Sequence, residues 1–162
     1  MLKNIIIGPQ DGILELGPGT GPFTELIQKI IPHPNAYLAI ERENQFIEIL
    51  KKRFPQLNFI QGSAEDASSI YQKFGIHPIR AIISSLPFAS LPHIVQTKII
   101  DSIYPLLSKG STFRTFQYVH AYALPTAIQF RKRMQAILGP CHISALVIRN
   151  IPPAFVLTWQ KT

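Results

Sequence analysis

The stretch Gly12-Ile-Leu-Glu-Leu-Gly-Pro-Gly-Thr-Gly21 joins a short apolar run to a turn that contains three glycines. A helical pattern begins directly after this turn, near Phe23. Glycines at alternate positions let the backbone turn sharply and approach a ligand closely, because no Cβ stands in the way. The start of a helix supplies free N–H groups. The stretch indicates a nucleotide-type pocket at the first strand–helix junction of an α/β sheet, and the alternative is a tight connection without a ligand.

An acidic residue before the turn distinguishes this pocket from a dinucleotide site. Gly17, Gly19 and Gly21 are followed by no further glycine at the offset that the dinucleotide fingerprint requires. Glu15 lies on the apolar run, just before the first of these glycines. A carboxylate is unexpected beside a pyrophosphate, but it suits a ligand that carries positive charge. The strand, the acid and the glycines together favour a site for such a ligand.

The composition is that of one globular domain. At 162 residues the chain is long enough for a single core, and contents of 46% hydrophobic and 15% charged residues exclude a disordered protein. Charges or prolines interrupt every apolar run, so we expect no membrane-spanning helix, and the first apolar patch is too short for a signal peptide. The one cysteine, Cys141, excludes an internal disulfide and fits a cytoplasmic protein. We expect it to be a core residue in a buried strand.

The formal net charge of +7 points to a polyanionic partner. Basic residues cluster at 51–53 and at 131–133. A basic surface attracts nucleic acid or an anionic membrane, and composition does not separate the two. Each cluster taken alone is more typical of a solvated helix face.

Apolar periodicity and breaker residues divide the chain into alternating strands and helices. Strands are expected at 12–16, 36–40, 57–61, 80–84, 111–118, 141–148 and 154–160, and helices at about 23–31, 44–54, 64–74, 92–107 and 126–138. This alternation predicts an α/β fold with a mostly parallel, Rossmann-like sheet and helices on both faces. The last two strands have no helix between them, so they should form an antiparallel hairpin at one edge.

The glycine stretch resembles motif I of the class I S-adenosylmethionine (SAM) methyltransferases, Glu-x-Gly-x-Gly-x-Gly. The resemblance implies a seven-stranded sheet in one domain, residues 1–162, and SAM as the cofactor. It assigns SAM contacts to the residues of the turn, which are Glu15, Gly17, Gly19, Thr20 and Gly21. Enzymes of this type carry a helix before the first strand, but only eleven residues precede Gly12, so we expect that covering helix to be absent.

Ligands of open α/β sheets bind at the carboxyl ends of the strands. Glu41 closes the second expected strand, where a carboxylate can accept both ribose hydroxyls. After the third strand, Ser63 and Ala64 lie at the turn that binds adenine in the resembled family. Either Glu65 or Asp66 would bind the adenine amino group there, or both are charges favoured by a helix N-terminus.

The fourth strand ends in Ser84-Ser85-Leu86-Pro87-Phe88. This segment resembles motif IV of methyltransferases that act on nitrogen, which is Asn-Leu-Pro-Tyr in the ribosomal RNA adenine dimethyltransferases. The resemblance implies catalytic roles for Ser85, as an acceptor beside the attacking nitrogen, and for Phe88, whose ring would stabilise positive charge. It implies a cofactor contact for Ser84. Serine is a weaker acceptor than Asn or Asp, which lowers the odds of an adenine substrate.

Three segments are more similar to the bacterial phospholipid N-methyltransferases. They are Ser-Leu-Pro-Phe followed by Ala-Ser-Leu-Pro92, Phe116-Gln-Tyr118, and Arg149-Asn-Ile-Pro-Pro-Ala154. This resemblance implies methyl transfer from SAM to the amine of phosphatidylethanolamine at an anionic membrane surface, the enzyme being cytoplasmic and peripheral at the inner membrane face. The alternatives are a ribosomal RNA adenine-N6 methyltransferase, with nucleic acid as the partner, and an inactive SAM-binding homologue.

The segment after the fifth strand supplies the remaining candidates. Tyr118 and His120 are expected to be catalytic, with the histidine removing a proton or binding phosphate and the tyrosine caging the amine. Tyr122 is expected to contact the substrate, and all three residues have packing roles as the alternative. Arg149 either holds the lipid phosphate or ties its turn together. The other histidines show no metal-ligand spacing, so no metal is expected.

Overall fold

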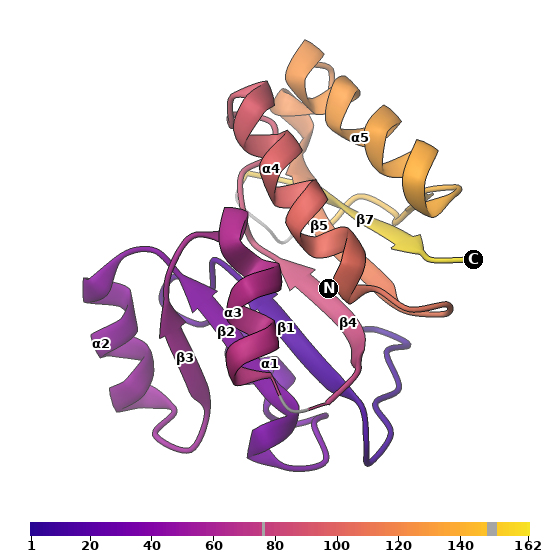
Figure 1. Ribbon diagram of the computed structural model, residues 1–162. Coiled ribbons are helices and arrows are strands. Elements are labelled where there is room, and N and C mark those ends of the chain that lie inside the picture. Colours follow the sequence, from indigo (N-terminus) through magenta and orange to yellow (C-terminus); the bar gives the residue numbers. More distant parts are fainter. Residues whose placement is uncertain (76, 149–151) are drawn as a thin grey trace.

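Seven strands form one sheet in the order β3-β2-β1-β4-β5-β7-β6 (Figure 1). The computed structural model describes residues 1–75, 77–148 and 152–162. The strands are β1 Gly12–Leu16, β2 Tyr37–Glu41, β3 Asn58–Gln61, β4 Ile79–Ser84, β5 Thr112–Tyr118, β6 His142–Ile143 and β7 Ala154–Gln160. The first five pair in parallel, and β7 runs antiparallel to both β5 and β6. The predicted class I methyltransferase topology is confirmed.

Helices cover the sheet on both faces. They are α1 Thr24–Ile27, α2 Asn44–Arg53, α3 Ala67–Phe74, α4 His93–Ile103 and α5 Pro125–Leu138, with short 3-10 turns at 34–36, 64–66, 104–106 and 119–121. In Figure 1, α3, α4 and α5 lie together on one side of the sheet. Within the described residues, no helix is both long and apolar enough to cross a membrane.

Strand alternation divides the core into two layers. Leu14 and Leu16 of β1 face α3, α4 and α5, in a cluster that includes Phe113 and Trp159. Ile13 faces the opposite way and packs with residues of α1 and α2. Glu15 also points to this second side, because it alternates with the leucines. The alternation therefore sets which residues at the ends of the strands can reach a common site.

Three expected elements are shorter than their sequence patterns. The helix expected at 23–31 is regular only at Thr24–Ile27, and the strand expected at 141–148 contains only His142–Ile143 and a separate bridge from Val147 to Ala154. Helix α4 ends at Ile103 and continues as a 3-10 turn that contains Pro105. Cys141 lies before β6 and is half-buried, so the expectation of a buried strand residue was wrong.

Candidate active site

Two adjoining cavities lie at the carboxyl ends of β1, β2 and β4. The first, here the acidic cavity, has a volume of about 90 Å³ and is lined by residues that include Gly17, Glu41, Ser63, Ala64, Glu65, Leu86, Leu91, Val95 and Ile99. The second, here the aromatic cavity, has a volume of about 510 Å³ and is lined by residues that include Met1, Gly17, Gly19, Thr20, Phe23, Ser85, Phe116, Tyr118, Val147 and Val156. Gly17 lines both cavities, so the two cavities meet at the glycine turn.

The three glycines of the turn have different structural roles, although all three adopt positive φ, of +65°, +59° and +88° in chain order. A Cβ on Gly17 would lie 2.7 Å from Leu86, and a Cβ on Gly21 would lie 2.7 Å from the ring of Phe54. A Cβ on Gly19 would have no atom within 4 Å, because this residue faces open space. Gly21 lines neither cavity and allows the turn to pack on α2. Its expected cofactor contact stays a prediction, and the structure shows a packing role for this glycine.

Glu41 ties the glycine turn to the end of β2. Its carboxylate accepts a hydrogen bond from the Gly19 N–H at 2.9 Å and another from the Glu43 N–H at 3.0 Å. The side chain is 6% exposed and lines the acidic cavity. Each carboxylate oxygen has two lone pairs, so both oxygens retain acceptor capacity toward that cavity.

Glu15 lies beneath the turn, without exposed surface. One carboxylate oxygen accepts hydrogen bonds from the hydroxyls of Tyr37, at 2.5 Å, and Thr24, at 2.8 Å. The other oxygen is buried with no hydrogen-bond partner among the described residues. Burial raises the pKa of the Glu15 carboxyl to about 7, since the bonds from Tyr37 and Thr24 oppose only part of this effect and the nearby Glu41 adds to it. Glu15 lines neither cavity, so the structure places it behind the cofactor-facing surface.

The turn after β3 brings polar groups to the acidic cavity. The Ser63 hydroxyl caps the following 3-10 turn by accepting the Glu65 N–H at 3.2 Å. Glu65 lines the cavity and forms an ion pair of 3.3 Å with Lys98. Asp66 lies instead at a separate surface depression beside α3 and α4. Of the two acids that the sequence left open, the structure brings Glu65 to the cavity.

The two adjacent serines after β4 point in different directions. Ser84 is fully buried, and its hydroxyl accepts the Leu86 N–H at 3.3 Å. Ser85 lines the aromatic cavity, and its Oγ is buried without a hydrogen-bond partner within the part of the chain that the structure describes. Ser84 is not among the residues that line either cavity, and its expected cofactor contact stays a prediction.

Phe88 is a core residue and not a wall of the site. It is fully buried, and its ring stacks on Phe130 with centroids 4.0 Å apart. Phe113 contacts it edge-on, with centroids 6.2 Å apart. The structure shows a packing role for Phe88, because the chain after Pro87 turns inward toward α5, and its expected catalytic role stays a prediction.

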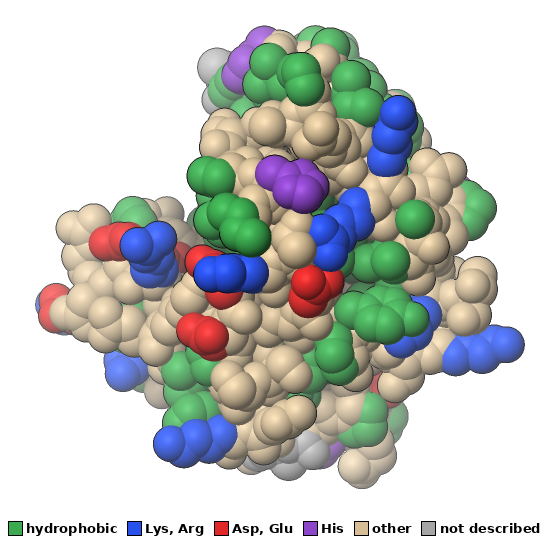
Figure 2. Space-filling model, turned by 45° about the horizontal axis from the view of Figure 1, so that its top comes forward, with side chains coloured by type: hydrophobic (Ala, Val, Ile, Leu, Met, Phe, Trp, Pro, Cys, Tyr) green, Lys and Arg blue, Asp and Glu red, His purple; other side chains and the backbone are tan. Residues whose placement is uncertain are grey.

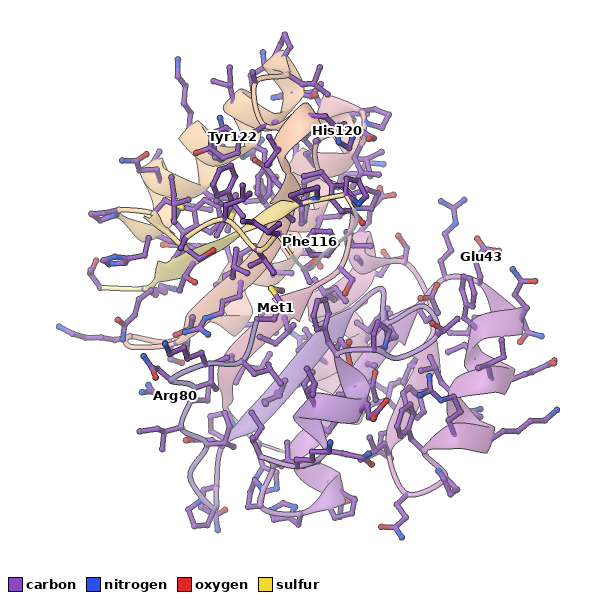
Figure 3. The ribbon with its side chains drawn as sticks, turned by 180° about the vertical axis from the view of Figure 1, so that it is seen from behind. Met1, Glu43, Arg80, Phe116, His120 and Tyr122 are labelled. Carbon is purple, nitrogen blue, oxygen red and sulfur yellow. The ribbon has the colours of Figure 1, made fainter. Side chains whose placement is uncertain are left out.

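Aromatic side chains from β5 and from the residue before α1 line the aromatic cavity, where Phe88 was expected. Phe116 contacts Phe23 at 6.2 Å and Tyr118 at 5.3 Å between ring centroids, both edge-on. The exposed His120 stacks on Tyr118 with an interplanar angle of 10° and centroids 5.6 Å apart. Phe116, Tyr118 and His120 alternate along the chain, and Phe116 lies close to Met1 (Figure 3). The ring contacts form a row from Phe23, beside the glycine turn, through Phe116 and Tyr118, which line the cavity, to the exposed His120.

Tyr122 does not join this row. Its ring packs edge-on against Phe155, with centroids 5.0 Å apart, and the Arg131 guanidinium lies 3.9 Å above it. Figure 3 shows Tyr122 apart from His120, toward α5. The 3-10 turn at 119–121 redirects the chain there, and the expected substrate contact of Tyr122 stays a prediction. Arg149, the other expected substrate contact, lies outside the described residues.

Some of the basic side chains form ion pairs or hydrogen bonds within the chain. Arg53 forms an ion pair of 3.3 Å with Glu25, and Arg133 forms one of 2.8 Å with Asp101. Arg131 donates to a side-chain amide of β5 at 2.6 Å. On the face shown in Figure 2, Lys and Arg side chains are scattered among acidic and apolar ones. The described residues also contain no group of three or more metal-ligating side chains.

The sequence missed the apolar residues of both cavities. Leu91, Val95 and Ile99 line the acidic cavity. Their spacing of four residues places Val95 and Ile99 on one side of α4, with Leu91 just before the helix begins. That spacing was visible in the sequence. Phe23 was expected only as the start of a helix, and its position against Phe116 depends on the sheet order.

The chain is similar to an ornithine lipid N-methyltransferase from Singulisphaera acidiphila, with 32% identity over 146 residues that cover 88% of this chain and 71% of the relative. It is also similar to ribosomal RNA small subunit methyltransferase A from Chlorobium phaeobacteroides, with 28% identity over 81% of this chain. The chain spans only 45% of that second relative. No protein-family model matches the chain.

Solved structures share the fold at low sequence identity. A putative methyltransferase from Streptococcus mutans in complex with SAH superposes with a TM-score of 0.68 at 16% identity, covering 98% of this chain and 93% of that one. A 16S rRNA methyltransferase from T. thermophilus in complex with AdoMet and guanosine gives a TM-score of 0.67 at 16% identity, covering 99% and 37%. With the glycine turn and the strand order, these similarities show that the chain belongs to the class I SAM-dependent methyltransferases, in the family of the ornithine lipid N-methyltransferase.

Proposed function

We propose that this methyltransferase acts on the primary amine of a membrane lipid, with phosphatidylethanolamine as the substrate. The observation that carries the proposal is the Ser85 hydroxyl, which is buried without a described partner where the glycine turn meets the aromatic cavity. A buried hydroxyl without a partner is costly, so its position favours a ligand that forms the missing hydrogen bond.

The residues around the glycine turn fit SAM. The open space at Gly19 allows a ligand to approach the backbone closely, which a Cβ would prevent. Glu41 would accept the ribose hydroxyls, and Ser63, Ala64 and Glu65 would contact the adenine. The ionised form of Glu15, with its unpaired buried oxygen, would stabilise a cationic ligand above the turn. Bound there, SAM supplies an activated methyl group for an in-line displacement.

The aromatic cavity fits an amine that becomes positively charged. The rings of Phe23, Phe116 and Tyr118 line it, and aromatic faces attract cations. Only a neutral amine attacks, and a cavity with these walls disfavours the protonated form because it excludes water. Ser85 would accept a hydrogen bond from the amine N–H and direct its lone pair toward the methyl group.

His120 would receive the proton that the amine loses. Its imidazole is exposed and stacks on Tyr118, which lines the cavity. An imidazole nitrogen can take a proton, directly or through water, and release it to solvent. Each cycle then releases one proton and leaves one more methyl group on the nitrogen.

Adenine in ribosomal RNA is the second candidate, because methyltransferases of that substrate class are among the relatives. The structure does not supply the aromatic partner that motif IV would offer to a flipped base, since Phe88 stacks on Phe130 inside the core. The basic clusters are also partly used in internal pairs. Phe88 also belongs to the segment that resembles the phospholipid enzymes, so the lipid is favoured by the similarity to the ornithine lipid N-methyltransferase, at 32% identity over 88% of this chain.

The role of Ser85 can be tested with a matched pair of serine variants. Ser85→Ala should lower kcat on phosphatidylethanolamine in mixed micelles about tenfold, since a lost hydrogen bond costs about 1 kcal/mol or slightly more. Ser90→Ala changes an exposed serine five residues away and should behave as wild type. Equal rates for the two variants would remove Ser85 from the mechanism.

A further inference from the structure

One side of the C-terminal half of the sheet is uncovered within the described residues. Helices α4 and α5 pack on the side to which Phe113 and Trp159 point. On the opposite side, β5 presents Arg114 and Phe116, and β7 presents Val156 and Thr158, the residues that alternate with the core positions. The first residues of the chain cross this side, where the Arg114 guanidinium donates to the carbonyls of Met1 and Lys3 at 2.8 and 2.7 Å.

A second cavity on this side extends the aromatic cavity. It has a volume of about 340 Å³, and Arg114, His142, Ile143 and Thr158 are among the residues that line it. Met1, Val147 and Val156 line both cavities. The two spaces therefore form one groove, here the strand-face groove, which begins beside Ser85 and continues over β5 and β7 to β6.

The register of the strands sets the direction of this groove. Phe116 of β5 pairs with Val156 of β7. Val156 in turn exchanges hydrogen bonds with Ser144, just after β6, at 2.9 and 3.0 Å. The groove thus crosses the strands from β4 to the edge of the sheet, which is three strand spacings or roughly 14 Å. This length exceeds what an amine and a methyl group require.

Much of the inner lining of the groove suits hydrocarbon. Its apolar residues include Met1, Phe116, Val147 and Val156, with Val147 at 40% exposure. Two charged residues, Lys3 and Arg114, line its outer part, and the Arg114 guanidinium donates to two backbone carbonyls. The groove is continuous with the cavity in which the lipid amine would react. We propose that it binds one acyl chain of the amine-bearing lipid, an inference that rests on the proposed function.

Two variants of groove residues that lie away from Ser85 test this proposal. Thr158→Phe fills the groove from β7, and His142→Glu places a charge at its outer end, on an exposed residue that pairs with Thr158 and therefore faces the groove, where folding is little affected. Ile94→Glu is the control, since it changes an exposed apolar residue of α4, at 61% exposure, that lines neither cavity of the groove. Each protein is assayed with dioleoyl phosphatidylethanolamine in micelles and with the dihexanoyl form below its micellar concentration.

We expect both groove variants to raise KM for the long-chain substrate about tenfold, while kcat/KM for the short-chain substrate changes less than twofold. The control variant should match wild type on both substrates. Equal losses on the two substrates, or no loss on the long-chain one, would overturn the proposal.

A direct binding measurement separates this proposal from the proposed function. The probe is a lysolipid with a fluorescent chain, titrated with each protein and followed by anisotropy. If wild type methylates neither lipid, the proposed function fails, and the probe measurement alone tests the groove. Probe binding that is weakened by Thr158→Phe and His142→Glu but not by Ile94→Glu supports the groove. Equal binding by all four proteins would overturn it.

Discussion

The Glu41 carboxylate accepts the Gly19 N–H at 2.9 Å, so a single side chain connects the end of β2 to the most open residue of the glycine turn. The two residues are 22 positions apart in the sequence. The same carboxylate faces the acidic cavity. Glu41 is therefore placed both to shape the turn and to meet a ligand that lies over it.

Replacing Glu41 should weaken SAM binding strongly. Glu41→Ala removes the acceptor for the Gly19 N–H and the proposed acceptor for the ribose, and hydrogen bonds to a charged group contribute about 1.5 to 3 kcal/mol each. We expect Kd for SAM to rise at least tenfold by isothermal titration calorimetry. Glu43→Ala is the control, because that exposed acid contributes only its backbone N–H. If the two variants bind SAM equally, Glu41 is not a cofactor residue.

The raised pKa of Glu15 predicts a stability that falls as pH rises. In the folded chain the pKa is about 7, above the ordinary value of 4.5, so the native state binds the proton more tightly than the unfolded state does. The cost of ionising Glu15 is absent below pH 4.5, grows between pH 4.5 and 7, and is complete above pH 7, where it reaches on the order of 3 kcal/mol.

Glu15→Gln removes this titration while keeping an acceptor for Tyr37 and Thr24. Between pH 5 and pH 8, the free energy of unfolding by urea should fall more steeply for wild type than for the variant. Parallel pH profiles of the two proteins would show that Glu15 has an ordinary pKa.

Substitutions at two glycines of the turn should have different effects: Gly21→Ala should lower the stability of the fold, and Gly19→Ala should weaken SAM binding. Gly21→Ala forces a Cβ to within 2.7 Å of Phe54 and 2.9 Å of Leu50 at a positive φ, so it should destabilise the fold by about 2 to 4 kcal/mol and lower Tm by roughly 4 to 16 °C. Gly19→Ala meets no atom, so it should cost only about 1 to 2 kcal/mol of backbone strain but abolish measurable SAM binding. The opposite ranking in thermal melts and SAM titrations would contradict the assigned roles.

Substitutions of Phe88 and Phe116 should also have different effects, the first mainly on stability and the second mainly on activity. Phe88→Leu should reduce the free energy of unfolding by about 1 to 3 kcal/mol, because it loses the stacked contact with Phe130, and leave kcat within a few-fold of wild type. Phe116→Leu removes a ring from the aromatic cavity and should lower kcat/KM about tenfold with a smaller effect on stability. Denaturation and initial-rate measurements on both variants decide between these assignments.

Local patterns predicted the topology because breaker residues and apolar periodicity mark each element of this chain. They did not predict which of two adjacent serines faces the cleft, since that depends on which side of the sheet each helix covers. Ser84 and Ser85 are equivalent in sequence, but strand alternation buries one in the core and places the other in the cavity. The aromatic row was predicted in part, at Tyr118 and His120, and Phe23 joins it only through the packing of α1 beside β5.

Similarity to motif IV and to motif I was an unreliable guide to where individual side chains lie. Phe88 matches motif IV in sequence, but its ring stacks on Phe130, a residue 42 positions later that no local pattern connects to it. In the same way, Gly21 matches motif I, but its lack of a Cβ serves the packing of Phe54. Long-range contacts determined both roles.

The most direct test of the central claim is a single reaction that contains labelled SAM, phosphatidylethanolamine micelles and structured ribosomal RNA, followed by separation of the lipid and RNA fractions. The account predicts label in the lipid fraction, reduced about tenfold by Ser85→Ala and unchanged by Ser90→Ala. Label that appears in the RNA fraction alone would contradict it and identify an adenine methyltransferase instead.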